Sequence, residues 1–259
     1  MVKLIASDLD GTLLRDYEQI IPEETLDVLR ELHEKGIIFV AASGRQYANM
    51  RKLFAPLGYE IPFISENGSL CIYNNEIIST GSIPKETIEH ILEGLYEYRE
   101  QYHTGHCIFS VPETYMTDST DERFLTAMKT RKNNISFIED LGQVKGKILK
   151  IAICDFGGTQ YLEPFFKERV GDEIRCATAA GEWLDFIAPD ANKGIALQNV
   201  LKKFGIKRDE CICFGDQSND VEMLKTAGTS YAMETAVPEA KEAADHVVPS
   251  VLSVLKTLL

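Results

Sequence analysis

Two acidic residues near the start of the chain have a spacing at which their side chains could share a cation. Asp8 and Asp10 lie in the segment DLDGT, residues 8–12, directly after the apolar run 2–7. Carboxylates at positions i and i+2 of an extended chain can project toward one side, where their repulsion demands a cation. Aspartates after a strand are also common in ordinary turns. Taken alone, this segment is therefore more typical of a turn than of a functional site.

A hydroxyl and a lysine elsewhere in the chain could bind an anion. Ser43 and Gly44 follow the apolar run 37–42 and precede a helical pattern. A hydroxyl and free backbone N–H groups at a helix start form an anion site, although serine is also an ordinary N-cap. Lys193 begins another helical pattern, where its charge opposes the favourable direction of the helix dipole. A lysine there is usually solvated, but this position favours a role toward an anion.

A third polar group follows the apolar run 211–214. It contains Asp216, Asn219 and Asp220, in the segment GDQSND. Such a segment can be a simple capping turn before a helix. Its carboxylates and amide are also oxygen ligands of the hard type that suits Mg²⁺.

Apolar runs alternate with amphipathic patterns in the first and last parts of the chain, which positions these polar groups at strand ends. Alternation of this kind predicts a parallel sheet covered by helices on both faces. In such sheets ligands bind beyond the carboxyl ends of the strands. The predicted strands are 2–7, 37–42, 61–65, 211–214 and 229–233, and the predicted helices are 22–35, 46–54, 193–204 and 221–225.

The middle of the chain has a different pattern. Asn67-Gly68 and Asn74-Asn75 separate short strand-like pieces, which predicts hairpins. A long helix starts at Pro84, and strands and helices then mix irregularly as far as residue 186. The sequence therefore predicts an α/β fold with a Rossmann-like parallel-sheet core, residues 1–82 and 188–259, and an inserted α+β domain, residues 83–187. The run 151–154 also ends in an aspartate, Asp155, but has no second carboxylate, which favours a simple turn.

Composition excludes several classes of function. Among 259 residues, 27 Lys and Arg face 40 Asp and Glu, a net charge of −13. Nucleic acids and anionic membranes both require basic surfaces, so neither is an expected partner. No apolar run approaches the roughly 18 residues of a membrane span. The six cysteines lie in a chain large enough to bury its own core, which favours free thiols and the reducing cytoplasm.

In this order and placement, the motifs resemble those of the haloacid dehalogenase-like hydrolase superfamily. The resemblance is to the Cof-type phosphatase subfamily, whose type IIB cap is inserted between the second and third motifs. The matching segments are 8–14 (DLDGTLL), 42–45 (ASGR), 193–194 (KG) and 215–220 (GDQSND).

The resemblance implies a role for each of these residues. Asp8 would be the nucleophile that forms an aspartyl phosphate, and Asp10 would be the general acid and base. Asp220 would orient Lys193 or a metal-bound water. The Mg²⁺ ligands would be Asp8, the backbone carbonyl of Asp10, and Asp216. The phosphoryl oxygens would be bound by Ser43, Lys193 and Asn219 and by the backbone amides of Leu9 and Gly44.

The function implied is a Mg²⁺-dependent phosphatase of small phosphorylated metabolites, of which sugar phosphates are the class typical of the family. A phosphomutase of the phosphomannomutase type would share the nucleophile and is the first alternative. A catalytically silent metabolite sensor is the second, disfavoured because all four motifs are intact. Nothing in residues 83–187 specifies one metabolite, and nothing in the sequence indicates an oligomeric state.

Overall fold

The chain folds into two compact units in the computed structural model, which describes residues 1–14, 18–179 and 181–259. Unit 1 comprises Met1–Thr80 and Asn192–Leu259, and unit 2 comprises Gly81–Ala191. Unit 2 therefore interrupts unit 1 between two of its segments. Gly81 packs against Ala188 and Ala191, so the two ends of unit 2 lie side by side within that unit.

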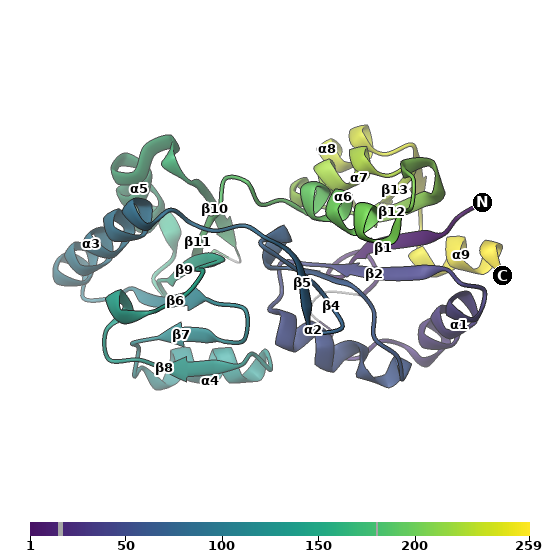
Figure 1. The fold of residues 1–259 in the computed structure, drawn as a ribbon. Coiled ribbons are helices and arrows are strands. Elements are labelled where there is room, and N and C mark those ends of the chain that lie inside the picture. The colour runs from purple at the N-terminus through teal and green to yellow at the C-terminus, as the bar shows by residue number, and fades with distance from the viewer. Residues whose placement is uncertain (15–17, 180) are drawn as a thin grey trace. The chain divides into compact units, whose positions relative to one another are not determined.

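Unit 1 is built on one sheet of eight strands in the order β14-β13-β12-β1-β2-β3-β4-β5 (Figure 1). The strands from β14 to β3 are parallel, and β4 and β5 form an antiparallel edge. The bounds are β1 (Leu4–Asp8), β2 (Ile38–Ala42), β3 (Phe63–Ser65), β4 (Leu70–Tyr73), β5 (Glu76–Thr80), β12 (Cys211–Gly215), β13 (Thr229–Met233) and β14 (His246–Val248).

Helices cover both faces of this sheet. Figure 1 shows α6, α7 and α8 on one face and α1 and α2 on the other. Strands β1 and β12 are buried along their whole length, which is why their sequences are apolar without alternation. The helices are α1 (Glu23–Glu34), α2 (Tyr47–Phe54), α6 (Lys193–Phe204), α7 (Val221–Thr226), α8 (Pro238–Ala243) and α9 (Val251–Leu255). Short 3₁₀ turns include η2 (Glu66–Gly68) and η6 (Ser218–Asp220).

Unit 2 is an α+β unit with a six-stranded sheet in the order β10-β11-β9-β6-β7-β8. Its strand pairs are antiparallel except β7 with β8. Helices α3 and α5 belong to one hydrophobic cluster of this unit, and α4 belongs to a second. The elements are α3 (Lys85–Tyr102), β6 (His106–Ser110), β7 (Tyr115–Thr117), α4 (Glu122–Thr130), β8 (Ile135–Phe137), β9 (Lys150–Cys154), α5 (Thr159–Val170), β10 (Arg175–Ala179) and β11 (Trp183–Ile187).

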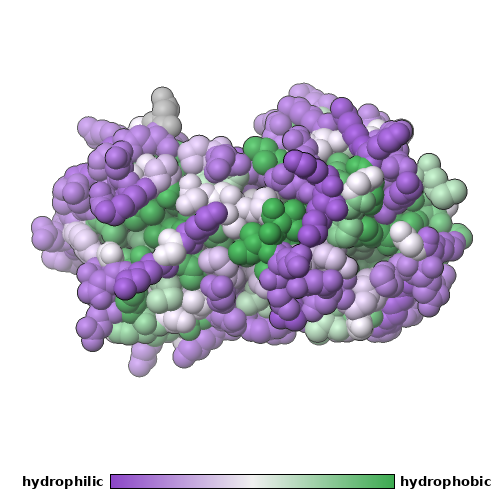
Figure 2. Space-filling view, viewed as in Figure 1, coloured by the Kyte–Doolittle hydropathy of each residue, from purple (hydrophilic) through white to green (hydrophobic). Residues whose placement is uncertain are grey.

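The parallel sheet of unit 1, its helices on both faces and the inserted α+β unit confirm the predicted fold class. Polar and charged side chains cover much of the face seen in Figure 2. The six cysteines are free, and all but Cys176 are buried. Among the residues that the structure describes, no helix has the length and apolar character to cross a membrane.

Candidate active site

The polar segments singled out in the sequence follow neighbouring strands of unit 1. Asp8 ends β1, Ser43 follows β2, and Asp216 follows β12. These strands are adjacent and parallel in the order β12-β1-β2, so their carboxyl ends meet at one edge of the sheet. Lys193 reaches the same place from the first residue of α6.

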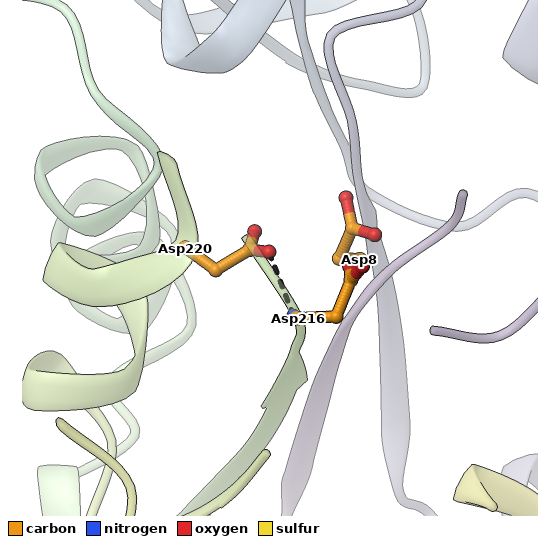
Figure 3. A group of neighbouring side chains, drawn as sticks. All are labelled: Asp8, Asp216 and Asp220. Atoms are coloured by element: carbon orange, nitrogen blue, oxygen red, sulfur yellow. Dashed lines mark hydrogen bonds between the residues drawn. The ribbon is translucent and has the colours of Figure 1, made fainter. Parts of the chain in front are cut away.

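Three carboxylates gather at this edge. Asp8, Asp216 and Asp220 each offer an oxygen within 4.8 Å of the others, and all three residues are buried. Figure 3 shows Asp220 extending from the start of the helical segment toward the two aspartates at the strand ends. Such closely spaced charges repel strongly away from water, so the cluster requires positive charge.

Lys193 supplies one positive charge. Its side chain is 0% exposed, and its Nζ donates to Asp8 Oδ1 at 2.5 Å and to Asp220 Oδ1 at 2.6 Å. Burial lowers the pKa of Lys193, but the charges of Asp220 and Asp8 outweigh burial, so the pKa lies above its ordinary value. The alternative of a solvated surface lysine is wrong, because the sheet edge encloses this side chain.

Asp8 remains incompletely satisfied. Its Oδ2 is buried and has no hydrogen-bond partner among the residues that the structure describes. Burial raises the pKa of the Asp8 carboxyl well above its usual value, Asp220 adds to this rise, and Lys193 acts in the opposite direction. A buried oxygen without a donor, beside two further carboxylates, fits a hard cation such as Mg²⁺.

Asp220 is engaged by donors at both oxygens. Its Oδ1 accepts from Lys193, and its Oδ2 accepts from the backbone N–H groups of Asp216 and Gln217 at 3.0 Å each. These bonds hold the loop after β12 and the lysine together. The geometry therefore suits Asp220 to positioning Lys193, one of the two roles that the resemblance implies for it.

Asp216 is held by two side chains that the sequence analysis did not assign to the site. Thr12 Oγ1 donates to Asp216 Oδ1 at 2.8 Å, and Gln217 Nε2 donates to Asp216 Oδ2 at 2.8 Å. Gly11 adopts φ +88°, and a Cβ there would lie 2.4 Å from Asp216 Oδ2. In the DLDGT segment, Gly11 therefore leaves room for the Asp216 carboxylate and Thr12 donates a hydrogen bond to it, although Asp216 is more than 200 residues away.

Asp10 is turned toward Arg45. The guanidinium donates to both carboxylate oxygens, from Nη2 to Oδ1 at 2.6 Å and from Nε to Oδ2 at 2.8 Å. Arg45 Nη2 also donates to the backbone carbonyl of Glu18 at 2.9 Å. Asp10 is thus a bidentate partner of Arg45. Arg45 belongs to the matching segment 42–45, but no role was assigned to it from the sequence. The role of the Asp10 backbone carbonyl as a metal ligand stays a prediction.

The predicted phosphoryl-binding residues lie on the same loops, and a further residue connects two of the loops. Ser43 is 2% exposed, and its hydroxyl accepts from the backbone N–H of Arg45 at 3.1 Å. Asn219 Nδ2 donates to Asn67 Oδ1 at 2.9 Å, and Asn67 packs against Gly44. Leu9 is fully buried beside Asp8. The sequence predicted Asn67 only as a turn residue.

The arrangement can support group transfer to a carboxylate. Asp8 is buried at a strand end, in contact with a charged lysine, and two further carboxylates can share a cation with it. The Ser43 hydroxyl and the Asn219 amide lie on the neighbouring loops. A carboxylate nucleophile in such surroundings suits an anionic, tetrahedral substrate group such as a phosphoryl group.

Comparison with known proteins agrees with this chemistry. Residues 5–253 match the haloacid dehalogenase-like hydrolase family. The 5-amino-6-(5-phospho-D-ribitylamino)uracil phosphatase of Escherichia coli strain K12 is 27% identical over 91% of this chain and 86% of its own length. A crystal structure from Eubacterium rectale superimposes with a TM-score of 0.88 at 30% identity, covering 100% of this chain and 99% of the other.

A subclass IIB sugar phosphatase of the same superfamily has a similar fold. It superimposes with a TM-score of 0.79 at 23% identity and covers 99% of each chain. The family match and these relatives confirm the prediction of a phosphatase-type hydrolase with an inserted cap. The protein belongs to the haloacid dehalogenase-like hydrolase family.

Proposed function

We propose that the protein is a Mg²⁺-dependent phosphatase that hydrolyses small phosphorylated metabolites through an aspartyl phosphate on Asp8. The observation that carries this proposal is the environment of Asp8. This carboxylate is buried, contacts Lys193 at 2.5 Å and keeps one oxygen without a protein partner.

In the first half of the reaction, an Asp8 oxygen bonds to phosphorus while the bond from phosphorus to the leaving oxygen breaks. Asp10 gives a proton to that leaving oxygen. For this step the Asp10 carboxyl must be protonated, so its ion pair with Arg45 must open. In the second half, Asp10 takes a proton from water, the water oxygen bonds to phosphorus, and the bond to Asp8 breaks.

The remaining residues bind and orient the phosphoryl group. Lys193 balances the charge that Asp8 and the phosphoryl oxygens share. The Ser43 hydroxyl, the Asn219 amide and the backbone N–H groups of Leu9 and Gly44 are the proposed donors to those oxygens. Mg²⁺, held by Asp8, Asp216 and the Asp10 carbonyl, would neutralise the charge on the carboxylates and the phosphoryl group.

The proposed substrates are phosphate monoesters of small polyhydroxylated metabolites, with sugar phosphates as the first class to test. Support comes from the family and from the relative in Escherichia coli, whose name specifies a phosphoribityl group. A cytoplasmic location is proposed with it, supported by six cysteines that are all thiols. A panel of phosphorylated metabolites, with phosphate release measured for the wild type and Asp8→Asn, tests the proposal.

We further propose that unit 2 selects the substrate. The residues of unit 1 that we propose to bind substrate contact the phosphoryl group. All the substrates share this group, so these residues cannot distinguish one leaving group from another. Joining Thr80 to Asn192 by a short linker should erase selectivity among metabolites more than it reduces cleavage of p-nitrophenyl phosphate. Because Gly81 and Ala191 lie side by side, a short linker can span the excision. Equal loss of kcat/KM for both kinds of substrate would show that unit 2 serves folding instead.

Product analysis separates hydrolysis from phosphoryl transfer within a sugar. We expect glucose 1-phosphate or mannose 1-phosphate to release inorganic phosphate with Mg²⁺ alone, because a hydrolase passes the phosphoryl group from Asp8 to water. Addition of the matching 1,6-bisphosphate should not change the rate. Formation of the 6-phosphate faster than free phosphate, and only with the bisphosphate, would identify a mutase. Asp8→Asn is the control, since it should stop both reactions.

A further inference from the structure

The turn after β3 contacts the loop that follows β2. Its residue Asn67 has a left-handed backbone, φ +57°, and donates from its backbone N–H to the Ser43 carbonyl at 3.0 Å. Its carboxamide lies against Gly44, where a Cβ would be only 3.0 Å from Asn67 Oδ1. Asn67 therefore holds the Ser43–Gly44 loop through its backbone and its side chain.

The same carboxamide orients Asn219. Asn219 Nδ2 donates to Asn67 Oδ1 at 2.9 Å. Asn219 Oδ1 is buried and has no hydrogen-bond partner among the described residues, so the bond to Asn67 is the one that sets the direction of this amide. One N–H of Asn219 points to Asn67, and the second remains for a ligand.

The next residue of the turn packs against the start of α6. Gly68 has φ +96°, and a Cβ there would lie 2.3 Å from the Asn192 carbonyl and 2.8 Å from the Lys193 backbone nitrogen. Asn192 caps α6 by accepting from the Ile195 backbone N–H at 2.8 Å. A single turn therefore touches the three loops that carry Ser43, Lys193 and Asn219.

We propose that Asn67 is a positioning residue of the phosphoryl site, acting through the Asn219 amide. This inference rests on the proposed function, since it assumes that Asn219 donates to a phosphoryl oxygen. A donor that is already oriented binds without losing rotational freedom. Removal of the Asn67 carboxamide leaves the Asn219 amide free to rotate. The phosphoryl group is then bound more weakly, because its donor is no longer oriented.

Two substitutions separate the carboxamide from the backbone. Asn67→Gly removes the carboxamide and tolerates the left-handed backbone, whereas Asn67→Ala removes it and strains the backbone. The probe is inorganic phosphate as a competitive inhibitor of p-nitrophenyl phosphate hydrolysis with saturating Mg²⁺. Both variants should raise the inhibition constant about 10-fold, the usual size for one hydrogen bond to a charged group. Asn67→Ala should in addition lower the melting temperature.

A double-mutant cycle tests the route through Asn219. Asn219→Ala alone should weaken phosphate binding, and N67G should have little additional effect in that background because the amide it orients is gone. Asn74→Gly is the matched control. Asn74 is also left-handed, at φ +51°, but it is exposed in the turn between β4 and β5, so phosphate inhibition should not change.

Three results would overturn the inference. Unchanged phosphate binding in N67G with a loss in N67A would show that only the turn backbone matters. Equal losses from N67G with and without N219A would show that the two residues act independently. If N219A does not change phosphate inhibition while D8N still abolishes turnover, Asn219 is not a donor to phosphate and this inference is wrong. The assignment of Asp8 as nucleophile would then remain. An active D8N variant would instead reject the proposed function itself.

Discussion

Replacing Asp8 with asparagine should reduce phosphatase turnover by at least about 10⁴-fold, as expected for loss of a covalent nucleophile. Asparagine has nearly the same shape but cannot bond to phosphorus in this way. The fold should persist, because burial disfavours the charge that is removed and Asp220 still accepts from Lys193. Turnover with p-nitrophenyl phosphate, together with thermal melting, checks both expectations.

Two companion variants sharpen this experiment. Asp155→Asn is a matched control, since Asp155 is also a buried aspartate just after a strand, but its side-chain partners are Tyr98, Thr104 and Gly157 in unit 2. Its activity should be close to that of the wild type. Asp10→Asn should slow release of the phosphoryl group from Asp8, so that a phosphorylated Asp8 becomes detectable by mass spectrometry. Folded D8N with more than trace activity would reject Asp8 as nucleophile.

Removal of divalent cations should abolish activity, and Mg²⁺ should restore it. With Asp8, Asp216 and Asp220 ionised, Lys193 leaves two negative charges uncompensated, and a phosphate dianion adds to them. Ca²⁺ should inhibit, because it is larger and less strict in its geometry. Activity assays after chelation and titration with each cation measure this dependence. Full activity in excess chelator would contradict the metal requirement.

Asp216→Ala isolates the metal-binding contribution. This variant should raise the Mg²⁺ concentration for half-maximal activity by at least about 10- to 100-fold, because that is already the usual cost of losing a residue that only supports a metal ligand. Independently of activity, Mg²⁺ should raise the melting temperature of the wild type by more than that of D216A. Asp209→Ala is the control, since Asp209 is exposed and precedes β12. It should retain the full response to Mg²⁺.

Most strands and helices of unit 1 could be predicted because the pattern of apolar residues within each short segment shows which residues are buried. The strand predicted at 37–42 forms over Ile38–Ala42, and the helix predicted at 193–204 has those bounds. Parallel strands covered on both faces have continuous apolar sequences, and the helices between them have one apolar face. These patterns do not depend on the order of the strands in the sheet, so they can be recognised without knowing that order.

Unit 2 was harder to interpret from sequence. Strand β6 and helix α4 were not predicted, although Phe124 and Met128 of α4 are almost completely buried. Short strands and short amphipathic helices carry few periodic positions. Their stability comes from packing against residues distant in the chain, here Trp183 against Phe124.

Some residues of the candidate site could likewise be predicted from the sequence, and others could not. Asp8, Asp10, Ser43, Lys193 and Asp216 could be proposed because each lies at a strand end or helix start within a short motif. Thr12, Arg45, Asn67 and Gln217 acquire their roles only through contacts with those residues. Asn67 illustrates the difference, because a turn residue became a partner of Asn219, which lies 152 positions later.

The order of the amino acids is enough to predict which chemical groups are present, that they follow strands, and that these strands form a parallel sheet. The folded arrangement was needed to show that Lys193 is enclosed between Asp8 and Asp220 and that Asp10 faces Arg45. It was also needed to show that one turn contacts the loops of the site. These contacts depend on the order of the strands in the sheet. Placing β12 beside β1 brings residues about 200 positions apart into contact, and that adjacency comes from packing the whole sheet, which no local pattern contains.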